Sequence, residues 1–247
     1  MNHILILVLF VSVTWTQEVL ENLSVIFLKQ KLALERLESK DSSQHLKKNF
    51  RGVWTNEKHS KYNLGYLGSN YQRLRVKVLS ASKTDGLGST YRVKGKTRTQ
   101  NFECSFTGEI EIIHVREVKE SDSPSMTQGL VVFKYYFKED TNQKGSGFFS
   151  GIGASSWYYK EKGTMKYDDF STASENYTNN EFVGTWTSHK TGQIKKAIWG
   201  DFRIPFSNGL DVGLGEFYPD STFQNNGWAS YVEEKQRNQE PAIWWKD

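Results

Sequence analysis

The residues best suited to chemistry lie in one dense segment, Trp199-Gly200-Asp201-Phe202-Arg203-Ile204-Pro205, which runs on to Asp211 and Glu216. Aromatic rings, glycines and charges of both signs are typical of a loop that lines a polar ligand site. Asp201, Asp211 and Glu216 are also the one acidic set that suits an acid–base pair of the glycosidase type. A structural interpretation stays open beside these, in which Asp201 simply pairs with Arg203.

Other catalytic chemistry has little support. The histidines beyond residue 16 are not at metal-site spacing: His45, His59, His114 and His189. The chain has no Gly-x-Ser-x-Gly string, no nucleotide loop and no cysteine–histidine pair in register. We therefore expect a non-catalytic protein with no catalytic residues, no metal and no cofactor. A barrel hydrolase or a cyclase-like enzyme that uses the three carboxylates is the alternative.

Charge and cysteine usage exclude several classes of protein. The net charge of +4 over 247 residues falls short of the dense basic block of a nucleic-acid binder, so we expect no nucleic-acid partner. The single cysteine, Cys104, excludes an intramolecular disulfide and a cysteine-based metal cluster. Cys104 alternates with Phe102 and Phe106, which favours a buried core thiol over a reactive one.

Residues 1–16 are typical of a signal peptide. The apolar run from Ile4 to Val13 has the length of an h-region and is too short to span a membrane. We expect a secreted or periplasmic protein without stable membrane insertion after cleavage, in a style more bacterial than eukaryotic. The alternative is a helix that starts near Ile4 and continues past Glu18.

Residues 17–49 are predicted to form a helix and a linker. Apolar residues at three- and four-residue spacing predict a helix over 18–40, and the polar residues 39–49 predict the linker. The apolar stripe either packs on the rest of the protein or mediates a homodimer.

Four Phe-x-Gly strings recur, beginning at Phe50, Phe106, Phe149 and Phe182. Two of them extend to Phe-x-Gly-x-Trp-Thr. A glycine inside a strand marks a bulge, a bend or a close backbone approach, and an aromatic residue two positions away lies on the same face and can cover it. The repetition predicts a curved antiparallel sheet that closes into a barrel, with both Gly-x-Trp copies as strands, neighbours at the seam.

Alternation of apolar and polar residues predicts about eight to ten strands with one dry and one wet face. The fold class we expect is all-β, a single antiparallel up-and-down β-barrel over residues 50–247, preceded by one N-terminal α-helix. The predicted strands cover 50–55, 73–79, 91–98, 102–112, 131–137, 148–159, 165–170, 182–187, 195–203 and 213–218.

The outward faces of residues 73–77 and 92–98 would bring seven cations together if the two strands pair. One interpretation is a surface for an anionic partner. The other is a solvated face whose charge is offset across strands by Glu109 and Glu111.

The Gly-x-Trp strings resemble the first strand of lipocalins and avidins, which are calycin-type barrels. Gly52-Val53-Trp54-Thr55-Asn56 with Ser60 follows the avidin pattern, except that His59 replaces the second glycine. Phe149-Ser150-Gly151 also resembles a Phe-Thr-Gly on a later avidin strand. The resemblance implies that Asn56 and Ser60 hydrogen-bond the polar ring of a ligand.

We therefore expect an exported barrel that binds a small or medium apolar or sugar-like ligand inside the barrel or at its mouth. The predicted ligand-binding residues are Trp54, Asn56, Ser60, Trp186, Trp199, Asp201 and Arg203. The alternative is a solid barrel in the envelope or medium, acting through its helix and its basic face.

Overall fold

The computed structural model describes most of the chain. The described residues are 22–55, 63–84, 88–100, 102–160, 163–170, 177–237 and 243–246. The leader predicted over residues 1–16 lies outside them, as do Asn56 and Ser60. None of the helices within the described ranges is both long and apolar enough to cross a membrane.

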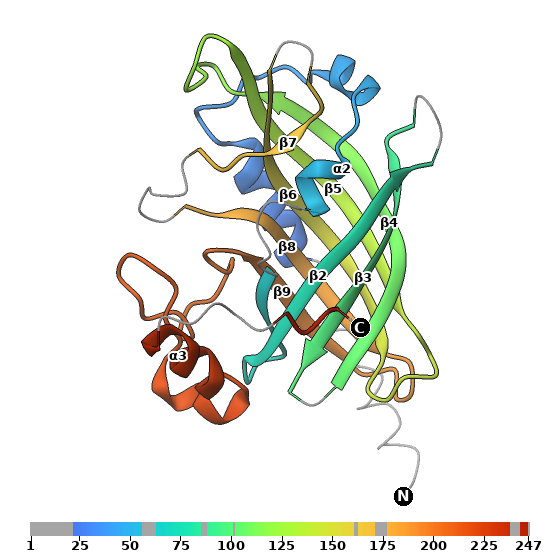
Figure 1. Ribbon diagram of the computed structural model, residues 1–247, viewed down its shortest axis with the longest axis vertical. Helices are drawn as coiled ribbons and strands as arrows, with labels where there is room; N and C mark the ends of the chain where they lie inside the picture. The colour runs from blue at the N-terminus through green and yellow to red at the C-terminus, as the bar shows by residue number, and fades with distance from the viewer. Residues whose placement is uncertain are drawn as a thin grey trace, which may run out of the picture.

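Nine antiparallel strands make up most of the described part of the fold (Figure 1). They are β1 (Asn63–Leu67), β2 (Gln72–Lys83), β3 (Thr90–Thr99), β4 (Phe102–Glu117), β5 (Met126–Glu139), β6 (Gly147–Lys160), β7 (Lys166–Tyr167), β8 (Asn179–Ser188) and β9 (Ile194–Asp201).

Eight strands form a closed ring in the order β1-β2-β3-β4-β5-β6-β8-β9, and β9 pairs back onto β1. The two-residue β7 pairs with β6 outside the ring and lies within the range 165–170 for which a strand is predicted. Every ring strand therefore neighbours the previous and the next ring strand along the chain. Because the ring is closed, each of the eight strands is paired with a neighbour on both sides.

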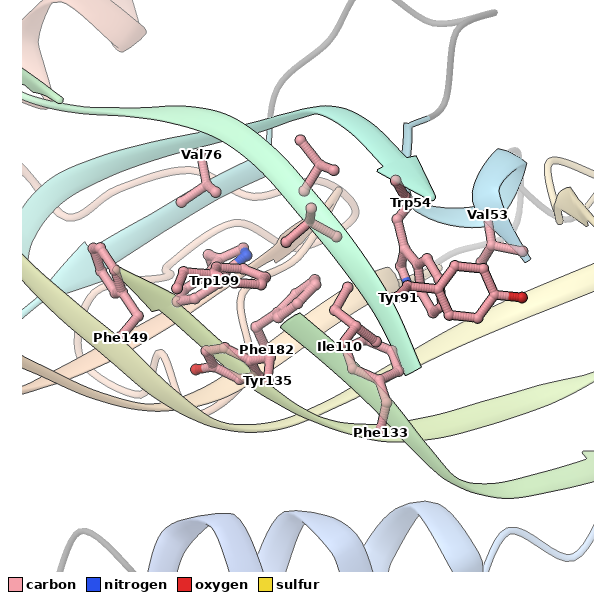
Figure 2. Packing of buried hydrophobic residues seen from close by; sticks show 14 of the residues in the cluster. Val53, Trp54, Val76, Tyr91, Ile110, Phe133, Tyr135, Phe149, Phe182 and Trp199 are labelled. Atoms are coloured by element: carbon pink, nitrogen blue, oxygen red, sulfur yellow. The ribbon is translucent and has the colours of Figure 1, made fainter. Parts of the chain in front are cut away.

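Alternation along the strands places one set of side chains inside the ring, where they form a continuous buried cluster. Figure 2 shows its central members, with Phe182, Tyr135 and Phe149 around Trp199. The rings of Phe182 and Trp199 stack with centroids 4.8 Å apart, and Tyr135 meets Trp199 edge-on at 5.2 Å. Packed aromatic side chains, rather than an open lumen, occupy this part of the interior.

The interior glycines are covered by aromatic residues of neighbouring strands, which corrects the expectation of cover from the same strand. Phe133 lies over Gly153, and the two are directly paired in register. Phe106 covers Gly95 and Phe137 covers Gly108 in the same way. Directly opposite residues lie closer together than residues two apart on one strand, so the cross-strand ring fills the space first.

The first Gly-x-Trp copy is not a strand. It forms the short helix α2 (Arg51–Thr55), whereas the second copy lies in β8 as predicted. Val53 and Trp54 of α2 point into one end of the ring, hereafter the α2 end (Figure 2). Trp54 contacts Tyr91 and Phe133 edge-on, so burial of this aromatic residue holds α2 as a plug rather than as a neighbour of β8.

Residues 22–32 are helical, but the predicted helix does not continue to residue 40. Leu37 instead forms an isolated β-bridge with Val118, and part of the predicted linker is a 3₁₀-helix, η1 (Ser43–Lys47). The helix runs outside the strands, with Phe27 buried against their outer surface (Figure 2). Its packing on the sheet follows one of the two predicted roles; the homodimer remains a prediction.

The strand predicted over 213–218 is absent, and that segment is an irregular loop with one β-bridge between Asp211 and Pro219. The chain then forms η2 (Ser221–Asn226) and α3 (Ala229–Gln236), two helices that are not among the predicted elements. Trp228, between them, is fully buried and donates its indole Nε1–H to the carbonyl of Tyr71 at 2.7 Å. This anchor holds the C-terminal region on the outside of the ring.

Candidate functional site

The three predicted ligand-binding tryptophans do not form one site. Trp54 plugs the α2 end, and Trp199 on β9 lies in the middle of the interior (Figure 2). Strand β8 starts beside α2, where Asn180 contacts Val53. Trp186 lies near the other end of β8, and therefore toward the end of the ring opposite the α2 end. All three are buried and pack against other aromatic or charged side chains of the protein.

Trp186 is held by a buried carboxylate. Its indole Nε1 donates to Oε2 of Glu139 at 3.1 Å, and the amide of Gly147 donates to the same oxygen at 2.7 Å. The hydroxyl of Thr97 donates to the other oxygen. Burial raises the pKa of Glu139, although these donors oppose the shift. Donors of the protein therefore meet both carboxylate oxygens of Glu139, which points to a structural role.

Cys104 is a buried thiol, as predicted. Burial, together with the nearby carboxylates of Glu139 and Asp140, raises its pKa to about 12. At that pKa the thiolate that would act as a nucleophile is scarcely populated near neutral pH.

Asp201 lies at the α2 end, where it joins four elements. Asn63 of β1 donates to Oδ1 at 2.8 Å, and Asn180 of β8 donates to Oδ2 at 3.2 Å. Tyr167 of β7 forms a further hydrogen bond. The side-chain Nδ2 of Asn180 also donates to the carbonyl of Val53 at 3.3 Å, which ties α2 to the same network.

Burial raises the pKa of Asp201 to about 6, while the hydrogen bonds from Tyr167 and Asn180 and the charge of Lys77 oppose the shift. A carboxyl with such a pKa can exchange protons near neutral pH. Its donors, however, come from the protein's own strands. The arrangement is thus a junction between β1, β7, β8 and β9, and it leaves acid–base chemistry as an alternative.

Arg203 pairs with Asp211 and not with Asp201, contrary to the structural interpretation offered from the sequence. Its Nη1 lies 2.6 Å from Oδ2 of Asp211, and its Nη2 donates to the carbonyl of Leu214 at 2.9 Å. Glu216 instead pairs with Lys235 on α3 at 2.5 Å. The three candidate carboxylates thus have three different sets of partners and do not face one another as a hydrolytic pair.

Four buried polar atoms of the ring interior have no hydrogen-bond partner among the described residues: Tyr135 Oη and the indole nitrogens of Trp54, Trp157 and Trp199. The phenol of Tyr135 lies against Gly151 and Gly184, which pair across β6 and β8. Burial raises its pKa well above the ordinary value. These atoms cost stability unless water or a ligand meets them.

A groove of about 740 Å³ lies on the outer face of β4, β5, β6 and β8, beside the start of the helix at residues 22–32. We call it the outer groove. Tyr136 and Phe148 contribute aromatic surface, with ring centroids 5.6 Å apart, and Tyr136 is 46% exposed. Val25 of the helix and Ile152 add further apolar surface.

Strand register sets the polar groups of the outer groove in rows. Glu109, Tyr136, Ser150 and Thr185 are paired in sequence across β4, β5, β6 and β8. Because neighbouring strands lie about 4.8 Å apart, this row presents a carboxylate, a phenol and two hydroxyls at a regular interval. A parallel row starts from Glu111 and Lys134, which face each other across β4 and β5.

Of the predicted ligand-binding residues that the structure describes, none lines the outer groove. The signal that could have found it is the outward set of each strand, in which Glu109, Tyr136 and Ser150 alternate with buried residues. Alternation shows which residues face outward, but not which of them meet across strands, because register depends on the loops and bulges between them.

Among the described residues, no group of three or more histidine, cysteine or acidic side chains could hold a metal ion. Comparisons with protein-family models, with curated proteins and with solved structures find no match to this chain. The resemblance to avidins and lipocalins therefore stays a prediction.

Proposed function

We propose that this protein is a non-catalytic binding protein, built on a calycin-type up-and-down barrel, that takes an extended sugar-like ligand in the outer groove. The observation that carries the proposal is the row Glu109, Tyr136, Ser150 and Thr185, which crosses four strands in register. The ligand is a small molecule or short chain with one apolar face and hydroxyl groups along its edges.

The side chains of the outer groove match both parts of such a ligand. Tyr136 and Phe148 supply ring faces for apolar contact, as aromatic residues do in most ligand sites. Ser150, Thr185 and the carboxylate of Glu109 supply donors and acceptors for hydroxyl groups. Because Glu109 and Glu111 outnumber Lys134 in the lining, the groove favours a neutral ligand over an anionic one.

The ring interior is a less suitable place for this ligand. Its aromatic residues are packed against one another, and a guest would have to displace rings such as Phe182 and Trp199. A catalytic role also has weaker support, since Asp201, Asp211 and Glu216 each have separate partners. Export through the leader predicted at residues 1–16 would bring the protein to extracellular glycans.

The proposal is tested by native mass spectrometry of the purified full chain with neutral oligosaccharides, namely cello-, chito- and malto-oligosaccharides. We expect at least one series to be retained, with affinity that rises with chain length as more of the row is occupied. Tyr136→Ala should weaken binding about tenfold, as expected for loss of a central aromatic contact.

Tyr218→Ala is the matched control. Tyr218 is 43% exposed, against 46% for Tyr136, but it lies in the loop before η2 and not in the outer groove. Its substitution should leave affinity unchanged. No retention of any neutral oligosaccharide would exclude the proposed ligand class, and equal losses in both variants would exclude the outer groove as its binding site.

A further inference from the structure

The polar groups of the outer groove repeat once per strand. One polar side chain lies on each of four adjacent strands, in the order Glu109, Tyr136, Ser150 and Thr185, hereafter the polar row. Adjacent strands lie about 4.8 Å apart, so the polar row spans about 14 Å from β4 to β8. The next residues in register, on β3 and β9, do not line the groove: Arg92 and Lys196. A chain molecule that crosses the strands here therefore meets the members of the polar row in succession.

Apolar side chains lie on both flanks of the polar row. Phe148 lies on one flank and Ile152 on the other, each two residues from Ser150 on β6. The helix at residues 22–32 joins the second flank, where Ser24 donates to the carbonyl of Val183, the partner of Ile152 in register. Phe148 and Ile152 are four residues apart, or about 13 Å at about 3.3 Å per residue. The two side chains fill part of this distance and leave a slot that suits a sugar ring standing on its edge.

Two hydroxyl groups of the polar row lie close together. Oγ of Ser150 and Oγ1 of Thr185 are 3.5 Å apart, which is longer than the usual length of an O–H···O hydrogen bond. A ligand hydroxyl seated between them can therefore bond to both. Gly151 and Gly184, the residues that follow Ser150 and precede Thr185, also line the groove. Because glycine has no side chain, the groove reaches the backbone of the sheet beside these two hydroxyls.

We propose that the ligand of the outer groove is a neutral β-1,4-linked glycan that crosses the strands on its edge, with one sugar on each member of the polar row. This inference rests on the function proposed above and names the ligand class of the same site. Successive sugars of a β-1,4-linked chain advance by nearly the spacing of adjacent strands, about 4.8 Å. The hydroxyl groups along one edge of the chain meet the polar row, and the apolar faces of its rings meet the flanks.

The regular interval of the polar row favours this linkage over α-1,4. A β-1,4-linked chain is an extended ribbon that keeps hydroxyl groups along both edges. An α-1,4-linked chain winds into a helix, so its hydroxyl groups turn away from side chains that follow one another across a sheet. The extended chain also loses less conformational freedom on binding, because its free form already resembles the bound one.

The test compares cellotetraose with maltotetraose, which have the same composition and differ only in linkage. Chitotetraose adds a second β-1,4-linked sugar chain. Titration calorimetry of the full chain measures the three affinities. We expect the tighter of the two β-1,4-linked tetrasaccharides to bind about tenfold more tightly than maltotetraose, the factor that one well-formed hydrogen bond supplies. Within the preferred series, affinity should rise up to the tetrasaccharide and then level off, because the polar row ends at Thr185.

Thr185→Val removes one hydroxyl of the polar row at nearly constant shape, and should weaken binding of the preferred tetrasaccharide about tenfold. Ser150→Ala should give a loss in the same direction if the first variant folds poorly. Thr187→Val is the matched control. Thr187 lies on the same strand, is half-buried like Thr185 and also lines the groove, but it is paired with Phe148 on the flank. Its substitution should leave the affinity unchanged.

The possible failures separate this inference from the function on which it rests. If none of the three tetrasaccharides binds, both are overturned. Equal or tighter binding of maltotetraose would overturn the β-1,4 linkage alone and leave the outer groove as a glycan site. Equal losses in Thr185→Val and Thr187→Val would show that the polar row does not receive the edge of the chain, and would overturn the edge-on orientation.

Discussion

The phenyl ring of Phe133 on β5 lies over Gly153 on β6, its directly paired neighbour. A Cβ atom built on Gly153 would overlap ring atoms of Phe133. The same relationship joins Phe106 with Gly95 and Phe137 with Gly108. Large aromatic side chains fit inside the closed sheet because the residue paired with each of them is a glycine. This explains why glycine recurs with the aromatic residues.

Substituting Gly153 with alanine should therefore lower the free energy of unfolding by about 1–3 kcal/mol, the usual cost of overpacking a core. Urea denaturation measures the change. Gly215→Ala is the control, because a Cβ atom at Gly215 meets no atom of the described residues within 4 Å, and it should change stability by less than about 0.5 kcal/mol. In a Phe133→Leu background the cost of Gly153→Ala should shrink; an undiminished cost there would show that Phe133 is not the obstacle.

Removal of the Tyr135 hydroxyl, unlike the substitution of Gly153, is not expected to lower stability. It is buried and has no partner among the described residues, so it loses hydration without gaining a hydrogen bond. Tyr135→Phe should leave the stability unchanged or raise it by about 1 kcal/mol. Thermal and urea unfolding of the purified protein measure this change.

Tyr66→Phe is the matched control for that experiment. Tyr66 is equally buried, but its hydroxyl donates to the carbonyl of Phe206 at 2.7 Å. Removing it should cost about 1–2 kcal/mol, because a paired carbonyl loses its donor. If Tyr135→Phe costs as much as Tyr66→Phe, the Tyr135 hydroxyl has a partner such as a bound water molecule inside the ring.

The junction at Asp201 predicts how stability depends on pH. Its pKa is about 6 in the folded protein and 3.8 in an unstructured chain, so the folded state holds the proton more tightly. The resulting stabilisation is complete below pH 3.8 and is lost as the pH rises through 6. The loss from this group is at most about 3 kcal/mol, from the size of the shift.

Asp201→Asn should therefore flatten the dependence of stability on pH between about pH 4 and 7, whatever its effect on stability at any one pH. Urea midpoints measured across that range give the slope. Glu139 and Asp168 have raised pKa values from the same cause, burial, so part of the slope should persist in the variant. An unchanged slope would show that Asp201 titrates at its ordinary pKa.

Much of the sheet could be predicted from the sequence, because alternation depends only on the residues of each strand. Leu74, Val76 and Val78 alternate with cations, and this pattern alone identifies β2. The prediction of a strand at the first Gly-x-Trp string is wrong because the structure of this segment depends on residues outside it. Trp54 and Val53 are apolar enough for a strand, and only their burial in the end of the ring stabilises the five-residue helix α2.

The candidate site was less predictable, since it depends on pairing across strands. Tyr136 and Ser150 meet in the outer groove because β5 and β6 pair without a register shift, whereas β4 and β5 shift between Ile112 and His114. No local pattern shows such a bulge in advance. The partner of Arg203 is equally hidden from the sequence, because the loop folds back to bring Asp211 within 2.6 Å.

The loop after β9 supplies the last prediction. Arg203 holds it from inside, with one hydrogen bond to Asp211, two to the carbonyl of Gly213 and one to that of Leu214. Leu214 itself is 99% exposed, so no packing of its own side chain holds the tip of the loop. The guanidinium fork is therefore the main constraint on the backbone at residues 213 and 214.

Arg203→Lys keeps the charge but loses the fork, and a lysine ammonium cannot reproduce the four hydrogen bonds. The amide of Val212, which donates to the carbonyl of Tyr218 at 2.9 Å, should then exchange its hydrogen about tenfold faster, while amides of β8 and β9 keep their rates. Lys235→Gln breaks the exposed pair with Glu216 and should leave the Val212 amide unaffected, because exposed pairs contribute little. Equal acceleration in both variants would place the constraint at α3 instead of Arg203.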